Sequence, residues 1–257
     1  MSEPPHALTD GYVDAAGHRI HYVEKGSGFP LLLIHGAFGS GTNFLQNHLG
    51  SYLAEHFHII APDSLAHGES DAPNDPALYG ARQRALNLAS VLDALDIDRA
   101  HVVGYSMGGW MASALATHHP ERIASLSIGG WDVVKGMYTP AAAWGLPEIT
   151  YDILGAMVRR DRPDMLDWLQ PENESALAAA VNGMNDLTGL AEGVADCPAP
   201  VALFMGKEDL YFNPTKQFAA DHDIPFLPLP GDHISLIEQY GAEAGRQISD
   251  FIARRKP

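Results

Sequence analysis

The pentapeptide Gly104-Tyr105-Ser106-Met107-Gly108 follows a short apolar run and precedes an alanine-rich stretch. A G-x-S-x-G segment between a buried strand and a helix places its serine on a sharp, strained turn. Glycine is needed at both ends, because a Cβ there would crowd the backbone crossing. Residues 109–116 predict a buried helix that starts at Ser106, so its hydroxyl would lie where the helix dipole favours negative charge. The sequence therefore predicts that Ser106 is a nucleophile on a strand–turn–helix unit.

Short apolar runs recur on both sides of this unit, and they are expected to be strands. They are residues 30–34, 57–61, 102–103, 123–128, 201–205 and 226–227. Runs without polar alternation suit strands that are covered on both faces of a parallel sheet. Helical stretches lie between them, as at 81–95 and 238–253. An antiparallel hairpin is expected at 11–24. This alternation predicts an α/β fold with an open, mostly parallel sheet flanked by helices.

The interval 132–195 interrupts this alternation. It contains aromatic residues, prolines and short amphipathic pieces, but no clear strand. We interpret it as a small helical cap inserted after the sixth strand. The predicted domains are then an α/β core formed by residues 1–131 and 196–257, and a cap formed by residues 132–195. An ordinary run of connecting helices is the alternative interpretation.

Composition limits the partners and the location of the protein. The 257 residues include 16 basic and 32 acidic side chains, a formal net charge of −16, so we expect no nucleic acid or membrane partner. The N-terminal residues lack the features of a signal peptide, and no stretch is long and apolar enough to span a membrane. Cys197 is the single cysteine, which favours a reducing, cytoplasmic setting. A small-molecule ester substrate and a monomer or homodimer are expected.

The predicted nucleophile requires a base and an acid. A serine hydroxyl is a poor nucleophile at neutral pH, so Ser106 needs a base within hydrogen-bond reach. His233 follows the last predicted strand in a turn before the final helix, and Asp209 follows the strand before it. An acid is needed to hold the tautomer of the base. The order Ser106, Asp209, His233 is the nucleophile–acid–base order of one hydrolase architecture. Asp132, which also follows a strand, remains a rival acid.

Acyl transfer also needs N–H donors for the oxyanion, each worth about 3 kcal/mol. The backbone N–H of Met107, directly after the nucleophile, is the first predicted donor. The second is expected from the loop 35–40, at Ala37. A simple tight turn after the strand is the alternative interpretation of His35-Gly36.

Several segments together resemble the α/β-hydrolase fold superfamily. They are His35-Gly36, the loop 63–70, Gly104 to Gly108, Gly206 to Asp209 and Gly231 to His233. The resemblance runs from about Gly11 to the C-terminus. It points to the branch that holds small carboxylesterases, carbon–carbon bond hydrolases and haloperoxidase-like esterases.

This resemblance implies the triad Ser106, Asp209 and His233, with the N–H groups of Ala37 and Met107 as the oxyanion hole, and no cofactor. The sequence departs from the family pattern at Ala66, where glycine is usual, and at Asp232, where a small residue is usual. Neither departure touches the triad. A serine nucleophile, rather than an aspartate, argues against a haloalkane dehalogenase or an epoxide hydrolase.

The predicted function is a serine hydrolase of the carboxylesterase type, which cleaves small carboxylic esters through an acyl-enzyme on Ser106. The residues expected to bind substrate are Phe38, Trp131, Tyr138, Trp144 and Ile234. The residues expected to line the acyl pocket, or equally to form the core of the cap, are Met137, Tyr138, Trp144, Leu146 and Trp168. No compact ligand cluster accompanies His35 or His67, so we expect no metal.

Two other functions remain open at this point. The first is a carbon–carbon bond hydrolase of vinylogous 1,5-diketones. Such substrates carry a carboxylate, and Arg159, Arg160 and Arg162 in the cap are candidates to bind it. The second is a signal-binding receptor on a hydrolase scaffold, with a vestigial triad and a protein partner, because a fold does not fix a function.

Overall fold

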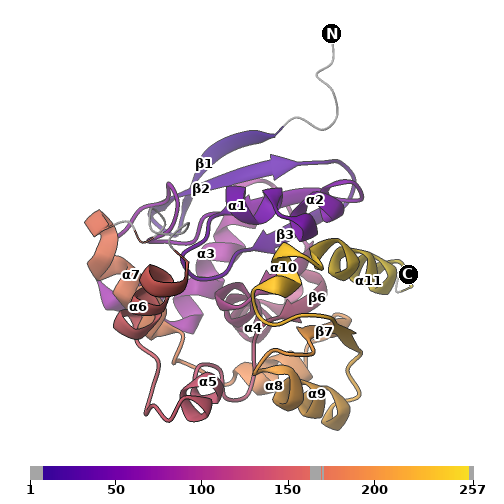
Figure 1. The fold of residues 1–257 in the computed structure, drawn as a ribbon. Coiled ribbons are helices and arrows are strands. Elements are labelled where there is room, and N and C mark those ends of the chain that lie inside the picture. The colour runs from indigo at the N-terminus through magenta and orange to yellow at the C-terminus, as the bar shows by residue number, and fades with distance from the viewer. Residues whose placement is uncertain (1–7, 163–168, 170, 255–257) are drawn as a thin grey trace.

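The computed structural model describes residues 8–162, 169 and 171–254, and these residues form one eight-stranded sheet (Figure 1). The strands are β1 (Thr9–Ala15), β2 (His18–Lys25), β3 (Pro30–Ile34), β4 (His58–Pro62), β5 (Ala100–Tyr105), β6 (Ile123–Gly129), β7 (Val201–Gly206) and β8 (Phe226–Leu229). Their order is β1-β2-β4-β3-β5-β6-β7-β8. β1, β2 and β4 pair antiparallel, and the remaining pairs are parallel. The predicted hairpin and mostly parallel sheet are confirmed.

Helices cover both faces of the sheet. They are α1 (Gly41–Gln46), α2 (His48–Ala54), α3 (Ala81–Ala94), α4 (Met107–His118), α5 (Tyr138–Ala143), α6 (Tyr151–Asp161), α7 (Glu174–Gly183), α8 (Leu190–Ala195), α9 (Phe212–Asp221), α10 (Ser235–Glu238) and α11 (Gly241–Ala253). Leu32 of β3 packs in one core with α3 and α4, while its neighbours Leu31 and Leu33 pack in a second core with α2 and α11. Successive side chains of a strand point to opposite faces, so both must be apolar here. This explains the unbroken apolar runs.

The segment between β6 and β7 contains α5, α6, α7 and α8, as expected for a helical insertion after the sixth strand. α6 packs against α7, and α7 packs against the short helix Pro76–Tyr79 that precedes α3. α8 instead packs against α4, beside the sheet. The division into a core and a separate cap remains a prediction. Among the described residues, every helix falls short of the length and apolar character that a bilayer crossing requires.

The predicted helix 238–253 is wrong in one respect, because the structure divides it. α10 ends at Glu238, and α11 begins at Gly241. Gly241 lies against α2, where a Cβ would come 2.6 Å from the backbone nitrogen of Leu49. The break redirects the chain so that α11 packs along α2.

Candidate active site

Ser106 lies at the turn between β5 and α4, in a backbone conformation that is rare for residues with a side chain. Its φ is 57° and its ψ is −120°, a conformation that costs on the order of 1–3 kcal/mol. The two flanking glycines are necessary: a Cβ on Gly104 would collide with the carbonyl of Gly108, and a Cβ on Gly108 with that of Ile34. The predicted strand–turn–helix unit is therefore present, with Ser106 at its sharpest point.

Three side chains that are far apart in the sequence meet at this turn. Ser106 Oγ lies 3.1 Å from Nε2 of His233. Nδ1 of His233 lies 2.9 Å from Oδ2 of Asp209. The Asp209 side chain is 2% exposed, and its second oxygen accepts a 3.0 Å hydrogen bond from the backbone N–H of Tyr211. Since an ionised carboxylate only accepts, the proton of His233 belongs on Nδ1. Nε2 is then free to accept the proton of Ser106.

Asp132, the rival acid, is occupied elsewhere. It is fully buried beyond the end of β6. Its Oδ1 accepts hydrogen bonds from the backbone N–H groups of Val134 and Lys135, at 2.9 and 3.1 Å. Its Oδ2 accepts a 2.6 Å hydrogen bond from the hydroxyl of Thr139. Asp132 thus stabilises the turn that enters α5, and the geometry favours Asp209 as the partner of His233.

The loop after β3 lies beside the nucleophile. A Cβ on Gly36 would be 3.3 Å from Cβ of Ser106. Nδ1 of His35 contacts the Gly36 carbonyl at 2.7 Å, while Nε2 accepts a 3.0 Å hydrogen bond from the backbone N–H of Ser64. Nδ1 is therefore the protonated nitrogen, and it holds the Gly36 carbonyl. The N–H of Ala37 belongs to the same trans peptide and points the opposite way. His35 thereby fixes the direction of the predicted oxyanion donor.

The loop 63–70, whose Ser64 N–H donates to His35, is itself held by several hydrogen bonds. The Asp63 carboxylate is buried and accepts hydrogen bonds from the backbone N–H groups of Gly41 and Glu69. It also contacts Nδ1 of His21 in β2 at 2.8 Å. Ala66, where glycine is usual in the family pattern, takes a φ of 69°. The departure noted in the sequence is therefore accommodated, with the left-handed backbone that normally favours glycine.

The predicted substrate-binding residues separate into a buried and an exposed group. Phe38 is 4% exposed, and its ring lies 6.0 Å from that of Tyr151 in α6. Trp131 is fully buried beyond β6, with its ring 6.1 Å from Tyr211. Ile234 follows His233 directly and is 44% exposed. Phe38 thus belongs to the loop after β3 with its ring toward α6, whereas Ile234 is in the turn that carries His233.

The aromatic residues of the cap are placed differently. Tyr138 and Trp144, at the two ends of α5, are 45% and 43% exposed. Met137 is buried, and its sulfur lies 3.7 Å from the hydroxyl of Tyr211. Leu146 packs against the larger core. Trp168 lies outside the described residues. A role for Tyr138 and Trp144 in binding substrate remains a prediction.

The three arginines of the cap, at the end of α6, point to different partners. Arg160 forms a bidentate pair with its neighbour Asp161 and is 73% exposed. Arg159 lies 3.7 Å from Glu174. Arg162 is 26% exposed and forms a 2.8 Å ion pair with Glu238 of α10, the helix that follows His233. Of the three, Arg162 reaches the segment that carries the predicted base.

The described residues give no support to two other kinds of reactive centre, a metal site and a nucleophilic cysteine. Among the described residues, no group of three or more His, Cys, Asp or Glu side chains is arranged to hold a metal ion. Cys197 is partly buried, and burial raises the pKa of its thiol. A thiol with a raised pKa is a poor nucleophile at neutral pH.

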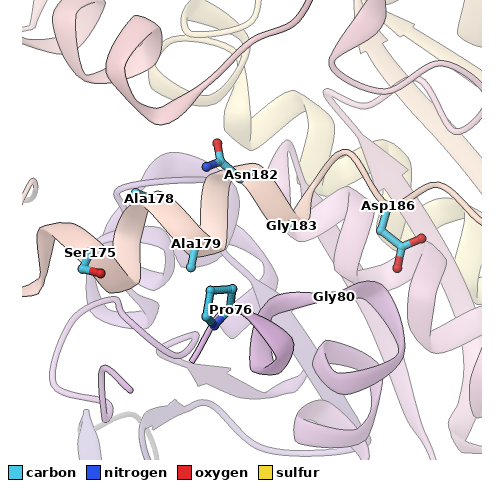
Figure 2. Close-up of a pocket in the computed structure, with 8 residues that line it drawn as sticks. All are labelled: Pro76, Gly80, Ser175, Ala178, Ala179, Asn182, Gly183 and Asp186. Atoms are coloured by element: carbon cyan, nitrogen blue, oxygen red, sulfur yellow. The ribbon is translucent and has the colours of Figure 1, made fainter. Parts of the chain in front are cut away.

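The protein also has a surface groove of about 450 Å³, whose lining residues are drawn in Figure 2. It runs between α7 and the segment 76–80, and Pro76, Ala179, Asn182 and Asp186 are among its lining residues. None of the predicted site residues lines it. The groove therefore gives no support to the predicted acyl pocket.

Sequence reasoning missed three residues that support the site. His35 orients the Gly36–Ala37 peptide, Tyr211 donates to Asp209, and Tyr105 donates to the backbone of His233. Tyr105 and His35 stand inside motifs that the sequence singles out, so their positions were visible. Their hydrogen bonds to His233 and Ser64 join segments that are far apart in the chain, and a sequence alone does not show which distant segments meet.

Comparison with known proteins places this site in a family. The family model described as the alpha/beta hydrolase fold matches residues 30–222. The chain belongs to the α/β hydrolase family. The sequence-based resemblance and the predicted fold class are thereby confirmed.

Among related proteins, this α/β hydrolase is similar to a 2-hydroxymuconate semialdehyde hydrolase of Pseudomonas putida. The two are 31% identical over 217 residues, which is 76% of this chain and 75% of that protein. A protein of the same description from Pseudomonas sp. strain CF600 is 41% identical over 135 residues. That match covers 51% of this chain and 47% of the relative, so the chain matches about half the length of that relative.

Solved structures show the same fold. A meta-cleavage product hydrolase from Pseudomonas fluorescens superposes with a TM-score of 0.74 at 22% identity, covering 96% of this chain and 98% of that one. The enol-lactonase from Burkholderia xenovorans gives 0.73 at 22% identity, covering 95% of this chain and 100% of the other. At these identities the likeness concerns the fold alone.

Proposed function

We propose that this α/β hydrolase cleaves a carbon–carbon bond in a vinylogous 1,5-dicarbonyl acid of the 2-hydroxymuconate semialdehyde type. The observation that carries this proposal is the 31% identity to a 2-hydroxymuconate semialdehyde hydrolase over three quarters of both chains. The arrangement of Ser106, His233 and Asp209 supports it, because it supplies a nucleophile, a base and an acid in contact. This proposal replaces ester hydrolysis, which the sequence alone favoured, as the principal activity.

The proposed reaction starts from the 2-keto tautomer of the substrate, which forms when the proton of the 2-hydroxyl group moves to the carbon beside the carbonyl that Ser106 attacks. That carbon is then a CH2 group conjugated through a double bond to the ketone. His233 Nε2 takes the proton of Ser106 as Oγ forms a bond to the carbonyl carbon. The N–H groups of Ala37 and Met107 hold the resulting oxyanion, and Asp209 stabilises the imidazolium. Collapse of the tetrahedral intermediate breaks the carbon–carbon bond. The electron pair moves into the conjugated ketone as a dienolate, which takes the proton from His233.

The second half of the reaction releases the acyl group. Water attacks the acyl-enzyme and gives one proton to His233, which returns it to Ser106 Oγ as the acyl bond breaks. The products are a carboxylic acid and a dienol acid, and one water is consumed. A carbon leaving group departs only as a stabilised enolate, so the substrate must keep its carboxylate end fixed and its ketone conjugated.

Arg162 is the proposed partner of that carboxylate. It extends from the end of α6 to Glu238 in α10, and α10 follows His233 by one residue. An arginine fork matches a carboxylate in two parallel hydrogen bonds, so the substrate carboxylate would have to replace Glu238, which Arg162 contacts at 2.8 Å. Tyr151, at the start of the same helix, contacts Phe38 in the loop of the proposed oxyanion hole. α6 thus contacts the loop after β3 through Tyr151, and Arg162, the residue after α6, pairs with the helix that follows His233.

Ester hydrolysis is the second candidate function. The same contacts among Ser106, His233 and Asp209 suffice for it, because an alcohol leaving group needs only the proton that His233 holds. The proposed carboxylesterase activity therefore shares every residue of the first half-reaction. It differs in having no need for a carboxylate-binding arginine.

A direct comparison of two substrates tests the proposal. Purified protein is given 2-hydroxymuconate semialdehyde, whose dienolate absorbance disappears on cleavage, and in parallel a p-nitrophenyl ester series from acetate to decanoate. We expect saturable turnover of the first substrate with a kcat/KM at least tenfold above that of any ester, and loss of both activities in Ser106→Ala. Preference for an ester would instead support the second candidate. A folded protein that turns over neither substrate would contradict both.

A further inference from the structure

Tyr105 connects the nucleophile to the base through the backbone. It is the last residue of β5, directly before Ser106, and its side chain is 4% exposed. Its hydroxyl donates a 2.7 Å hydrogen bond to the backbone carbonyl of His233. Ser106 and His233 are 127 residues apart in the chain. The Tyr105 hydroxyl therefore ties the turn that carries the nucleophile to the turn that carries the base.

Two tyrosine rings also contact the imidazole of His233. The centroid of the Tyr105 ring is 5.2 Å from that of His233, and the Tyr211 ring is 5.7 Å away. The backbone N–H of Tyr211 donates to the Asp209 oxygen that does not contact His233. The acid and the imidazole are thus both held by neighbours.

Tyr105 and Asp209 act on different parts of His233. Asp209 contacts the imidazole ring and sets its tautomer, whereas Tyr105 contacts the His233 carbonyl, in the backbone from which the ring extends. Asp232 stabilises the turn internally, because its carboxylate accepts from the backbone N–H groups of Ile234 and Ser235. Those bonds are local to the turn, so they do not fix its distance from β5. The Tyr105 hydrogen bond connects the turn directly to β5.

The Tyr105 phenol remains a donor at every working pH. Burial raises its pKa well above the ordinary value of 10, and the charges of Asp209 and Asp232 raise it further. A phenol that does not ionise keeps its proton for the His233 carbonyl.

We propose that Tyr105 is a positioning residue whose hydroxyl, by holding the His233 backbone, sets the separation between Ser106 Oγ and His233 Nε2. The proposal rests on the triad of the proposed function. The present separation of 3.1 Å lies near the upper end of the range of about 2.6–3.2 Å in which proton transfer is efficient. A misplacement of about 1 Å can cost a factor of about 100 in rate. Even a small outward movement of His233 therefore slows the attack.

The test is Tyr105→Phe, which removes the hydroxyl and keeps the ring. Tyr79→Phe is the matched control, because Tyr79 is also fully buried and its hydroxyl donates a 2.8 Å hydrogen bond to a backbone carbonyl, that of Pro73. Both variants lose one buried phenol hydroxyl. Thermal unfolding measures the structural effect of each loss.

Two rates report the position of His233. The first is the second-order rate of Ser106 phosphonylation by a fluorophosphonate probe, which needs the triad and no natural substrate. The second is kcat, measured separately from KM with the better substrate. For Tyr105→Phe we expect both rates to fall about tenfold, with KM unchanged and a melting temperature close to that of Tyr79→Phe. Tyr79→Phe should keep both rates.

Specific results would overturn the proposal. Unchanged rates in Tyr105→Phe would remove the positioning role, and equal losses in Tyr79→Phe would show that any buried hydroxyl matters as much. Failure of the probe to label the wild-type Ser106 would contradict the triad itself. If wild type is labelled but inert toward 2-hydroxymuconate semialdehyde, the proposed substrate is wrong, and the comparison of labelling rates still decides the role of Tyr105.

Discussion

Replacing Asp209 by asparagine tests the acid with almost no change of shape. The new side chain would keep a carbonyl oxygen and gain an NH2 group, and the two existing contacts decide how it orients. The backbone N–H of Tyr211 points at one oxygen of Asp209, and Nδ1 of His233 contacts the other. If the amide oxygen accepts from Tyr211, the NH2 group faces Nδ1. The imidazole must then carry its proton on Nε2, where it cannot accept the proton of Ser106.

The opposite orientation of the amide is unfavourable. The NH2 group and the Tyr211 N–H, both donors, would then face each other. The site is buried, since the Asp209 side chain is 2% exposed. Leaving a buried donor unpaired costs about 1–3 kcal/mol, and the lost charge-assisted bond to the imidazolium about 1.5–3 kcal/mol. Since about 1.4 kcal/mol corresponds to a factor of ten in rate, we expect kcat to fall about 10²- to 10⁴-fold in Asp209→Asn.

Asp132→Asn is the control for this experiment. Its amide oxygen can accept from the N–H groups of Val134 and Lys135, and its NH2 group can donate to the rotatable hydroxyl of Thr139. We expect kcat within about threefold of wild type. The assay is steady-state turnover of both substrates, with thermal unfolding to verify the fold. Large loss in Asp132→Asn together with an active Asp209→Asn would refute the assignment of the acid.

Three other perturbations probe the buried histidines, Arg162 and the loop after β3. Burial lowers the pKa of His35 and His67 below the ordinary 6.5. Below about pH 6.5 the unfolded chain therefore binds more protons than the folded protein. In that range the free energy of unfolding should decrease as the pH is lowered, by about 1.4 kcal/mol per pH unit for each histidine. Urea unfolding from pH 5 to 8 measures this slope, which His67→Gln should lower by the share of one histidine; a flat profile would contradict neutral, buried histidines. Arg162→Met should raise KM for 2-hydroxymuconate semialdehyde about tenfold and leave p-nitrophenyl acetate unaffected, whereas the exposed Arg160→Met should change neither; equal effects would exclude carboxylate recognition by Arg162. Phe38→Ala should shift the optimal p-nitrophenyl ester to a longer acyl chain, because it removes a buried ring beside the nucleophile loop; an unchanged profile would exclude Phe38 from acyl selection.

Much of the fold could be predicted from the sequence, because its signals are local. The apolar run at residues 30–34 coincides with β3, and the strand, turn and helix around Ser106 follow from glycine spacing and an alanine-rich stretch. The chain order also indicated His233 and Asp209. These inferences depend on residues next to one another or on the rule that parallel strands end at one edge.

The remaining features depend on distant chain segments. The choice between Asp209 and Asp132 is made by the N–H groups that surround each carboxylate. The break before Gly241 arises because the chain there meets Leu49 of α2. The exposure of Tyr138 depends on where α5 lies relative to the core, and a sequence pattern cannot distinguish an exposed aromatic residue from a pocket residue.

The hydrogen bond from Ser64 to His35 connects the antiparallel edge of the sheet to the loop that carries the predicted oxyanion donor. Ser70, in the same loop as Ser64, accepts from the backbone N–H of His21 and donates to the carbonyl of Asp63. His21 belongs to β2, so a relay of short contacts runs from the N-terminal hairpin through this loop to the Gly36 carbonyl. The orientation of the predicted oxyanion donor, the Ala37 N–H, therefore depends on a strand that carries none of the predicted site residues. Substitutions in β2 that leave the triad untouched will register as changes in rate.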